Sequence, residues 1–318
     1  MKLFPGSAAF AAARPAGGPR LALAIGNFDG VHLGHQALLA EARARAAGRG
    51  GPAAVLTFTP HPARLFAPAT APPLIMSLDR RLELLATAGI DIAVVEPFTR
   101  DFAGIEADEF VRRVLAHDLA AGDLVVGYDF SFGRGRAGNV ARLGALGAEL
   151  GLGVAVIPPV TVDGLPCSST RVRELCAAGE VAAAARLLGR PPEVEGRVAR
   201  GAARGRGLGF PTANVVPDGE LRPKLGIYAA RARVLDGPEA GTVRPAAVSV
   251  GRNPTFTGLD APVSVEAYLL DYEGDLYHRR LRLELLDRLR DEQKFDTIDA
   301  LVQQIHADVD RVRALVSP

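Results

Sequence analysis

The sequence predicts two domains of different class: an open parallel α/β sheet, followed by an antiparallel β-barrel domain with a C-terminal helix. Three observations support this prediction. The chain has 318 residues, which is more than one hydrophobic core usually serves. In the first part, short apolar runs alternate with helix-like segments, as they do in parallel sheets. In the last part, apolar residues alternate with a period of two between Gly, Pro and Asp turns, which is typical of a small antiparallel barrel.

Short apolar runs in the first part predict five buried strands, at residues 21–25, 53–58, 90–95, 124–126 and 154–157. The segments between them predict helices at residues 31–47, 78–88, 107–115 and 140–150. Gly89 follows the second of these helices, at a position where glycine commonly ends a helix. Before the first strand, the apolar stretch 7–13 is too short for a signal peptide and is followed by Arg14 and Pro15. We therefore expect an edge strand and a loose loop there.

The pattern changes after Leu188, where residues 189–196 (GRPPEVEG) predict a linker. We place the domain boundary there, giving domains 1–187 and 188–318. Period-two strands are predicted at residues 194–199, 226–235, 246–250, 263–270 and 281–286. Residues 297–316 predict an amphipathic helix. Its apolar stripe, which we expect to be core, consists of Ile298, Leu301, Val302, Ile305, Val309 and Val312.

Composition excludes several classes of protein. The 37 basic and 36 acidic residues nearly cancel, 6% of residues are aromatic and there is no Trp, which argues against a nucleic-acid groove or stacking platform. Two cysteines, Cys167 and Cys176, argue against a disulfide framework and a zinc site, and fit the cytoplasm. No run approaches the ~20 apolar residues of a membrane span. We expect no nucleic-acid or membrane partner and at most weak self-association.

The turn after the first predicted strand, residues 26–35 (GNFDGVHLGH), has the composition of an anion site. Glycines let backbone approach a ligand closely, and the N-terminus of the next helix attracts negative charge. His32 and His35 share one face of that helix and can donate hydrogen bonds to phosphate oxygens. Gly34 leaves room between them. Alone, such a pair is more often a surface or core pair; a metal site would need a third ligand that the neighbouring sequence lacks.

Three more polar segments follow predicted strands, at residues 57–62 (TFTPHP), 127–133 (GYDFSFG) and 168–173 (SSTRVR). The carboxyl ends of strands are where open α/β sheets bind ligands. Ordinary structural roles compete at each position: Ser168 or Ser169 as a helix N-cap, Arg171 as a solvated charge, and His61 as a turn residue.

In the second domain, residues 201–214 (GAARGRGLGFPTAN) form a Gly-rich loop whose backbone could close over phosphates; a flexible hairpin is the alternative. Thr212 and Asn214 are two residues apart, so on a strand both point to one face and offer the oxygen ligands that Mg²⁺ prefers. Residues 263–269 (VSVEAYL) alternate, with Glu266 opposite the core face. A glutamate in that position is most often simply solvated.

The segment GNFDGVHLGH resembles the signature of the α/β nucleotidylyltransferase superfamily, whose fold is Rossmann-like. It resembles in particular the FMN adenylyltransferase half of the prokaryotic bifunctional riboflavin kinase/FAD synthetases. The three polar segments are similar to that family's TFxPHP, GxDFxFG and SSTxIR motifs, and GRGLGFPTAN is similar to its riboflavin kinase loop. Residues 226–228, 251–256 and 289–295 add weaker matches. The resemblance runs from about Leu21 to Val316.

The resemblance implies an enzyme that phosphorylates riboflavin to FMN in the second domain and adenylylates FMN to FAD in the first, releasing pyrophosphate. Its partners would be riboflavin, FMN, FAD and ATP, with Mg²⁺, or Mn²⁺ in its place. In the first domain His32, His35 and Arg171 would be catalytic. The other residues implied to bind ATP or flavin there are Gly26, Asn27, Phe28, Asp29, Gly34, His61, Asp129, Ser168 and Thr170. Asn139 departs from the acidic residue that the family often shows.

In the second domain the resemblance implies that Glu266 is the base that accepts a proton from the ribityl hydroxyl, and that Thr212 and Asn214 are metal ligands. The ATP- or flavin-binding residues implied there are Gly205, Gly207, Gly209, Pro211, Thr212, Asn214, Asn253, Arg290 and Phe295. One rival function is an adenylyltransferase whose barrel only binds flavin or another partner, against which Thr212, Asn214 and Glu266 argue. The other rival is a nucleic-acid module, since small barrels bind oligonucleotides.

Overall fold

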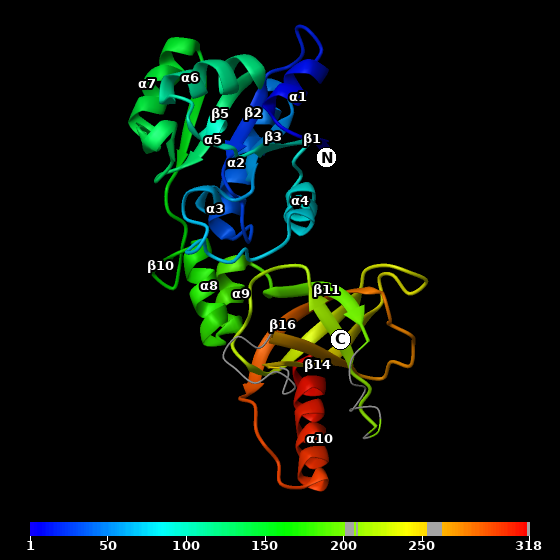
Figure 1. Cartoon of the computed structure of the whole chain (residues 1–318). Helices are drawn as coiled ribbons and strands as arrows, with labels where there is room; N and C mark the ends of the chain where they lie inside the picture. The colour runs from blue at the N-terminus through cyan, green and yellow to red at the C-terminus, as the bar shows by residue number, and fades with distance from the viewer. Residues whose placement is uncertain (201–206, 208, 253–262, 317–318) are drawn as a thin grey trace. The chain divides into compact units, whose positions relative to one another are not determined.

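The computed structural model describes residues 1–200, 207, 209–252 and 263–316, which belong to two compact units (Figure 1). The first unit comprises Met1–Pro73 and Leu78–Cys167, and the second comprises Leu74–Ser77 and Ser168–Pro318. The boundary expected between residues 187 and 188 stays a prediction. None of the described helices is both long enough and apolar enough to span a membrane.

The first unit is built on a parallel sheet with the strand order β1-β4-β3-β2-β5-β8. Its strands are β1 (Lys2–Phe4), β2 (Leu21–Ile25), β3 (Ala53–Thr59), β4 (Ile92–Pro97), β5 (Ala121–Gly127) and β8 (Gly153–Ile157). All five residues of β2 are buried, as expected of a continuous apolar run inside a parallel sheet. The predicted parallel α/β fold and its five strands are confirmed.

The helices of this unit are α1 (Ser7–Ala13), α2 (Leu33–Arg49), α3 (Pro62–Phe66), α4 (Leu78–Thr87), α5 (Arg100–Ala103), α6 (Ala107–Glu109) and α7 (Val140–Leu150). A π-helical segment, η1 (Phe110–Asp118), continues α6, so the helix predicted at 107–115 is longer and irregular. A single 3₁₀ turn is η2 (Arg134–Arg136). The strand at the N-terminal edge is confirmed, but the expected loose loop is wrong. Residues 7–13 are helical because Phe10 is buried against Phe4, with ring centroids 5.1 Å apart.

Two short hairpins escaped the sequence analysis: β6 (Ser131–Phe132) with β7 (Gly138–Asn139), and β9 (Thr161–Val162) with β10 (Leu165–Pro166). Two-residue strands are too short to show a periodic pattern.

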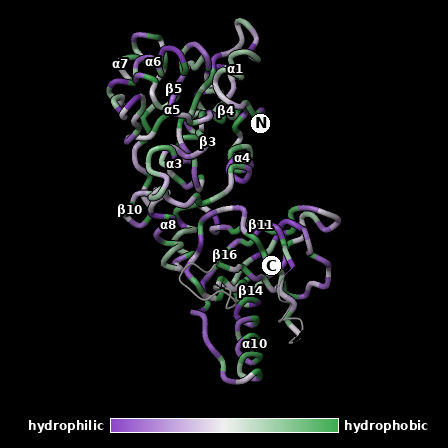
Figure 2. The backbone as a smooth tube through the Cα atoms, in the orientation of Figure 1, coloured by the Kyte–Doolittle hydropathy of each residue, from purple (hydrophilic) through white to green (hydrophobic). Residues whose placement is uncertain are grey.

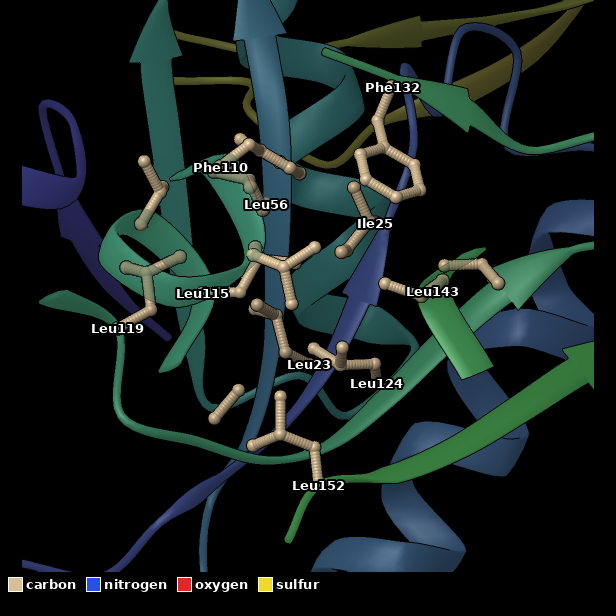
Figure 3. Close-up of a cluster of buried hydrophobic side chains, with 14 of the residues drawn as sticks. Leu23, Ile25, Leu56, Phe110, Leu115, Leu119, Leu124, Phe132, Leu143 and Leu152 are labelled. Atoms are coloured by element: carbon tan, nitrogen blue, oxygen red, sulfur yellow. The ribbon is translucent and has the colours of Figure 1, made fainter. Parts of the chain in front are cut away.

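The hydrophobic core of the first unit lies between the sheet and its helices. Figure 3 shows Leu23, Ile25 and Leu56 of the strands meeting Phe110 and Leu115 of η1. This packing fixes the strands, and with them the loops at their carboxyl ends.

The strand order places the carboxyl ends of β2 and β5 at a topological switch point. The chain passes outward from β2 to β3 and β4, and then returns to place β5 on the other side of β2. In open α/β sheets, ligands bind in the crevice outside such a point. The residues that follow β2 are 26–32, and those that follow β5 are 128–130.

The second unit begins with α8 (Ser169–Ala178) and α9 (Val181–Leu188). A closed antiparallel barrel follows, with the order β11-β12-β15-β14-β13-β16. Its strands are β11 (Glu193–Ala199), β12 (Ala213–Pro217), β13 (Gly226–Val234), β14 (Val243–Arg252), β15 (Val263–Leu269) and β16 (Arg280–Arg290). The predicted barrel is confirmed. Its strand β12 was not among the predicted strand ranges.

The C-terminal helix α10 (Ile298–Leu315) is confirmed and packs on the outside of the barrel. Figure 2 shows hydrophobic and hydrophilic stretches alternating along it. Val309 and Val312 are buried against Ala229 and Leu289 of the barrel. The predicted stripe is wrong at its first residue, because Ile298 is 65% exposed. The helix contacts the barrel mainly through its C-terminal half.

Candidate active sites

The turn between β2 and α2 has an unusual backbone. Phe28, Gly30 and Val31 have φ angles of 50°, 85° and 41°, in the left-handed region. For a β-branched valine this conformation is rare and persists only where the surroundings enforce it. The Val31 N–H donates to the Phe28 carbonyl at 3.1 Å, and Gln36 Nε2 donates to the Val31 carbonyl at 3.0 Å. Phe28 is fully buried beneath the turn.

The structure brings the two histidines of this turn together. His32 is the N-cap of α2, and its Nδ1 accepts a hydrogen bond from the His35 N–H at 3.3 Å. The two rings stack, with centroids 3.7 Å apart and planes 21° from parallel. A Cβ on Gly34 would lie 3.0 Å from Cε1 of His32, so only glycine leaves the ring in place. Because Nδ1 of His32 is an acceptor, its neutral ring carries the proton on Nε2, which makes that atom a donor.

A buried arginine that the sequence analysis missed supports the same turn. Arg81 of α4 is 3% exposed, and its Nη1 donates to the Asn27 carbonyl at 2.6 Å and to Thr57 Oγ1 at 3.3 Å. Burial lowers the pKa of Arg81, and the nearby charge of Asp29 opposes that shift. The signal was present in the sequence. Arg81 lies in the helical stripe that includes Leu78 and Leu85, and a charge inside an apolar stripe needs a buried partner.

The other residues proposed for this domain have identifiable structural roles. Nδ1 of His61 accepts from the Ala63 N–H at 3.2 Å, which makes His61 the N-cap of α3. Asp129 is exposed just after β5, beside the switch point. Asn139, the departure from the family's acidic residue, caps α7 by accepting from the Arg142 N–H at 2.9 Å.

A series of phenylalanine rings lies in the same unit, and the sequence analysis missed it. Ring centroids between 5.4 and 6.1 Å apart connect seven of the chain's 13 phenylalanines: Phe66, Phe98, Phe58, Phe102, Phe110, Phe132 and Phe130. Phe66, at one end, is 69% exposed. The residues are spread along the chain from Phe58 to Phe132, and only the fold brings them together. An exposed aromatic ring backed by others offers an apolar wall for a flat ligand.

Ser168, Thr170 and Arg171 open helix α8, which belongs to the second compact unit. Ser168 Oγ accepts from the Arg171 N–H at 3.1 Å, the capping role that competed with ligand binding. Thr170 is exposed, and the Arg171 guanidinium forms an ion pair with Glu174 at 3.1 Å.

The barrel carries a cluster of oxygen-bearing side chains. Thr212 Oγ1 donates to Glu266 Oε2 at 3.2 Å. Asn214 on β12 is directly opposite Glu266 on β15, and such cross-strand pairs hold their Cβ atoms about 4.5–5.5 Å apart. A hydroxyl, an amide and a carboxylate are therefore gathered on one face. This donor set fits Mg²⁺, which prefers hard oxygen ligands.

The end of the Gly-rich loop is fixed by an aromatic anchor. Phe210 is buried edge-on against Tyr268 of the barrel and His306 of α10, with centroids 5.5 and 5.2 Å away. Gly207 and Gly209 before it are exposed in open space, and Gly209 has a φ of 86°. Pro211 is also exposed. The predicted residues Gly205 and Asn253 lie outside the described residues.

Arg290 and Phe295 come together elsewhere on the barrel. Arg290 Nη2 donates to Asp308 Oδ2 of α10 at 2.7 Å, and Arg290 Nε lies 3.0 and 3.1 Å from the two carboxylate oxygens. The Phe295 ring lies 5.8 Å from the guanidinium carbon. Strand β16, which carries Arg290, is not a neighbour of β12 or β15. No strand pairing therefore joins Arg290 to the strands of the Thr212, Asn214 and Glu266 cluster, although helix α10 contacts both Arg290, through Asp308, and Phe210, through His306.

Comparisons with known proteins match both halves of the chain. The family model for FAD synthetase matches residues 16–171, and the family model for riboflavin kinase matches residues 188–316. Three relatives carry the name bifunctional riboflavin kinase/FMN adenylyltransferase. The protein of Pseudomonas fluorescens is 40% identical and covers 92% of both chains; that of Escherichia coli K12 is 37% identical and covers 90% of both. That of Listeria monocytogenes is 35% identical and covers 92% of this chain and 91% of its own.

A solved structure from Streptococcus pneumoniae, titled a macrolide-efflux protein, has the same fold over nearly the whole chain. It superimposes with a TM-score of 0.85 at 29% identity and covers 98% of this chain and 99% of its own. The two family models, in this order, and the full-length relatives agree with the two folds and their motifs. The chain therefore belongs to the bifunctional riboflavin kinase/FMN adenylyltransferase family.

Proposed function

We propose that this chain uses one ATP to phosphorylate riboflavin to FMN and a second ATP to adenylylate FMN to FAD. The observation that carries the proposal is the presence of two separate polar sites in one chain. One is the stacked His32 and His35 at the start of α2, and the other is the Thr212, Asn214 and Glu266 cluster on the barrel. Each lies within the stretch matched by the corresponding family model.

Adenylyl transfer needs charge stabilisation rather than a general base. The phosphate of FMN is already ionised, so one of its oxygens attacks the α-phosphorus of ATP directly while pyrophosphate leaves. We assign His32, His35 and the positive end of the α2 helix dipole to the negative charge of the triphosphate, which grows on the leaving group. Arg171 is our further choice for that charge. The remaining binding residues of the first domain keep the roles that the family resemblance implies.

We propose that the flavin ring of FMN packs against Phe66, the exposed end of the series of phenylalanine rings. A flat isoalloxazine ring needs an apolar surface, and aromatic rings supply one with defined stacking geometry. The ring centroids of Phe66 and Phe98 lie 6.1 Å apart, and the two ring planes are nearly perpendicular, at 78°.

Phosphorylation of riboflavin does need a base, because its ribityl hydroxyl carries a proton. We assign that role to Glu266: its carboxylate accepts the proton as the hydroxyl oxygen attacks the γ-phosphorus of ATP, and ADP leaves. Thr212 and Asn214 would hold Mg²⁺ together with the ATP phosphates, and the bound ion would neutralise phosphate charge. Thr212 Oγ1 already donates a hydrogen bond to Glu266 Oε2, so the hydroxyl and the proposed base lie side by side. Arg290 and Phe295 are proposed to support the flavin side of this domain.

We keep the domain boundary between residues 187 and 188. We also propose that the protein is cytoplasmic, because ATP is available there and free thiols such as Cys167 and Cys176 persist there. The nearly balanced charge, 37 basic against 36 acidic residues, gives no reason to assign a nucleic-acid partner.

Two separate incubations test the proposal. With riboflavin, ATP and Mg²⁺, the first products should be FMN and ADP; with FMN, ATP and Mg²⁺, they should be FAD and pyrophosphate in equal amounts. A chelator should stop both reactions, and Mn²⁺ in place of Mg²⁺ identifies the preferred metal. Failure to release pyrophosphate from FMN and ATP would contradict the assignment of the first domain, and failure to form ADP with riboflavin would contradict that of the second.

A further inference from the structure

A buried cation lies directly beneath the turn that carries the two histidines. Arg81 is 3% exposed and reaches from α4 to the carboxyl ends of β2 and β3. Its Nη1 donates to the Asn27 carbonyl at 2.6 Å, a short and strong contact for a charged donor. Thr57 Oγ1 donates to the same carbonyl at 3.1 Å. The Asn27 carbonyl therefore receives two hydrogen bonds from side chains of neighbouring elements.

The turn needs such support because its backbone is strained. Phe28 and Val31 are both in the left-handed region, at φ angles of 50° and 41°. Conformations of this kind are unfavourable for residues other than glycine and persist only where other contacts over-determine them. Gln36 holds one end of the turn by donating to the Val31 carbonyl at 3.0 Å. Arg81 holds the other end, immediately before Phe28.

A buried arginine is itself expensive unless its charge is balanced. Asp29, which is 2% exposed and belongs to the same turn, supplies the opposite charge. Nε of Arg81 is buried without a hydrogen-bond partner among the residues described. The hydrogen bonds that the Arg81 guanidinium does make, to the Asn27 carbonyl and to Thr57 Oγ1, are both directed at the turn and the strand beside it.

We infer that Arg81 is a positioning residue of the adenylyltransferase site, which clamps the Asn27 carbonyl and so holds residues 26–31 in the strained conformation that presents His32 and His35 to the triphosphate. The inference rests on the proposed function. Arg81 acts through the turn, so its loss should lower the rate of the chemical step more than it weakens substrate binding.

The test uses Arg81→Met and Arg81→Lys in the full chain. Methionine fills a similar volume without a donor, and kcat for FAD formation should fall about 30- to 100-fold, the loss expected when reacting groups are misplaced by about 1 Å. Lysine retains the charge and can donate to the same carbonyl, so kcat should return to within about threefold of wild type. In both variants KM for FMN should change by less than about threefold. Riboflavin phosphorylation in the same preparations should be unchanged, since it uses the other site.

Arg45→Met is the matched control. Arg45 of α2 also joins two elements of this unit, since it donates to Glu41 on its own helix at 2.7 Å and to Asp123 of β5 at 3.0 Å. Asp123 lies near the amino end of β5, whereas the proposed site lies at the carboxyl ends of the strands. Asp123 keeps its ion pair with Arg49. FAD formation by Arg45→Met should stay within about twofold of wild type.

Three results would overturn the inference: an Arg81→Met rate within about threefold of wild type, an Arg81→Lys rate as low as that of methionine, or an equal loss in Arg45→Met. If Arg81→Met is not recovered folded, Arg81→Leu, which also lacks a donor, replaces it, and a wild-type rate in that variant would overturn the inference as well. A wild-type chain that forms no FAD from FMN would instead contradict the proposed function itself.

Discussion

Replacing Asp308 by alanine should destabilise the second unit by about 3 kcal/mol. Asp308 is 3% exposed on α10 and receives hydrogen bonds from Arg290 Nη2 at 2.7 Å and from Gln304 Nε2 at 3.0 Å. Removing one member of a buried ion pair costs about 3–5 kcal/mol, because the other charge is left without compensation. We take the lower end, since the Arg290 side chain is 14% exposed and keeps a bond to the Asp291 carbonyl at 3.0 Å.

Urea unfolding followed by circular dichroism measures this loss, and the midpoint of the thermal transition should fall by roughly 10 °C. Asp310→Ala, an exposed position on the same helix, is the control and should change the free energy of unfolding by less than about 0.5 kcal/mol. Replacing the pair together, as Arg290→Met with Asp308→Leu, should recover most of the loss, since well-packed apolar residues often substitute for a buried pair. A loss below about 1 kcal/mol in Asp308→Ala, or a double variant no more stable than the single one, would refute the reasoning.

Three further predictions address the sites and the thiols. Glu266→Gln should lower riboflavin phosphorylation at least about 100-fold while FMN is still converted to FAD; loss of both activities would contradict two separate sites. Replacing His32 and His35 by alanine should make FMN accumulate from riboflavin, and an unchanged rate of FAD formation would show that the histidines are wrongly assigned. Burial raises the pKa of Cys176 to about 12, so at pH 8 a thiol reagent should label Cys167 and leave Cys176 unreacted until the chain unfolds. Because the pKa of Cys176 is raised in the folded state, its contribution to stability is complete below the ordinary thiol pKa and is lost as pH rises through about 12. Rapid labelling of both thiols in the native chain would contradict the burial of Cys176.

The elements that the sequence predicted well are those whose local signals agree with their tertiary surroundings. Strand β2 is a run of five apolar residues that are all buried, so composition and burial give the same answer. Helix α7 begins at the N-cap Asn139 and ends before Gly151, which has a φ of 65°, and its predicted bounds match. The alternation along β15 predicted that Val265 and Ala267 face the barrel core while Glu266 does not, and the burial of these residues follows that order.

The features that were missed depend on contacts between distant parts of the chain. Strand β12 has only five residues and becomes a strand by pairing with β11 and β15. The series of phenylalanine rings joins residues from Phe58 to Phe132, which no local pattern connects. The helical stripe marks Arg81 as a buried charge, but its acceptor could not be found from the sequence, because the Asn27 carbonyl lies 54 positions earlier in the chain. The order and types of the motif residues were enough to find them in the sequence, but not to predict their contacts. His61 and Ser168, for example, each cap the N-terminus of a helix.

If one chain performs both steps at separate sites, incubating the full chain with riboflavin, ATP and Mg²⁺ and separating the flavins over time should reveal both. We expect FMN to appear first, FAD to follow after a lag, and total flavin to stay constant. FMN that accumulates without FAD would contradict the assignment of the first unit. The absence of both products, when FMN supplied directly is still converted to FAD, would contradict the assignment of the barrel.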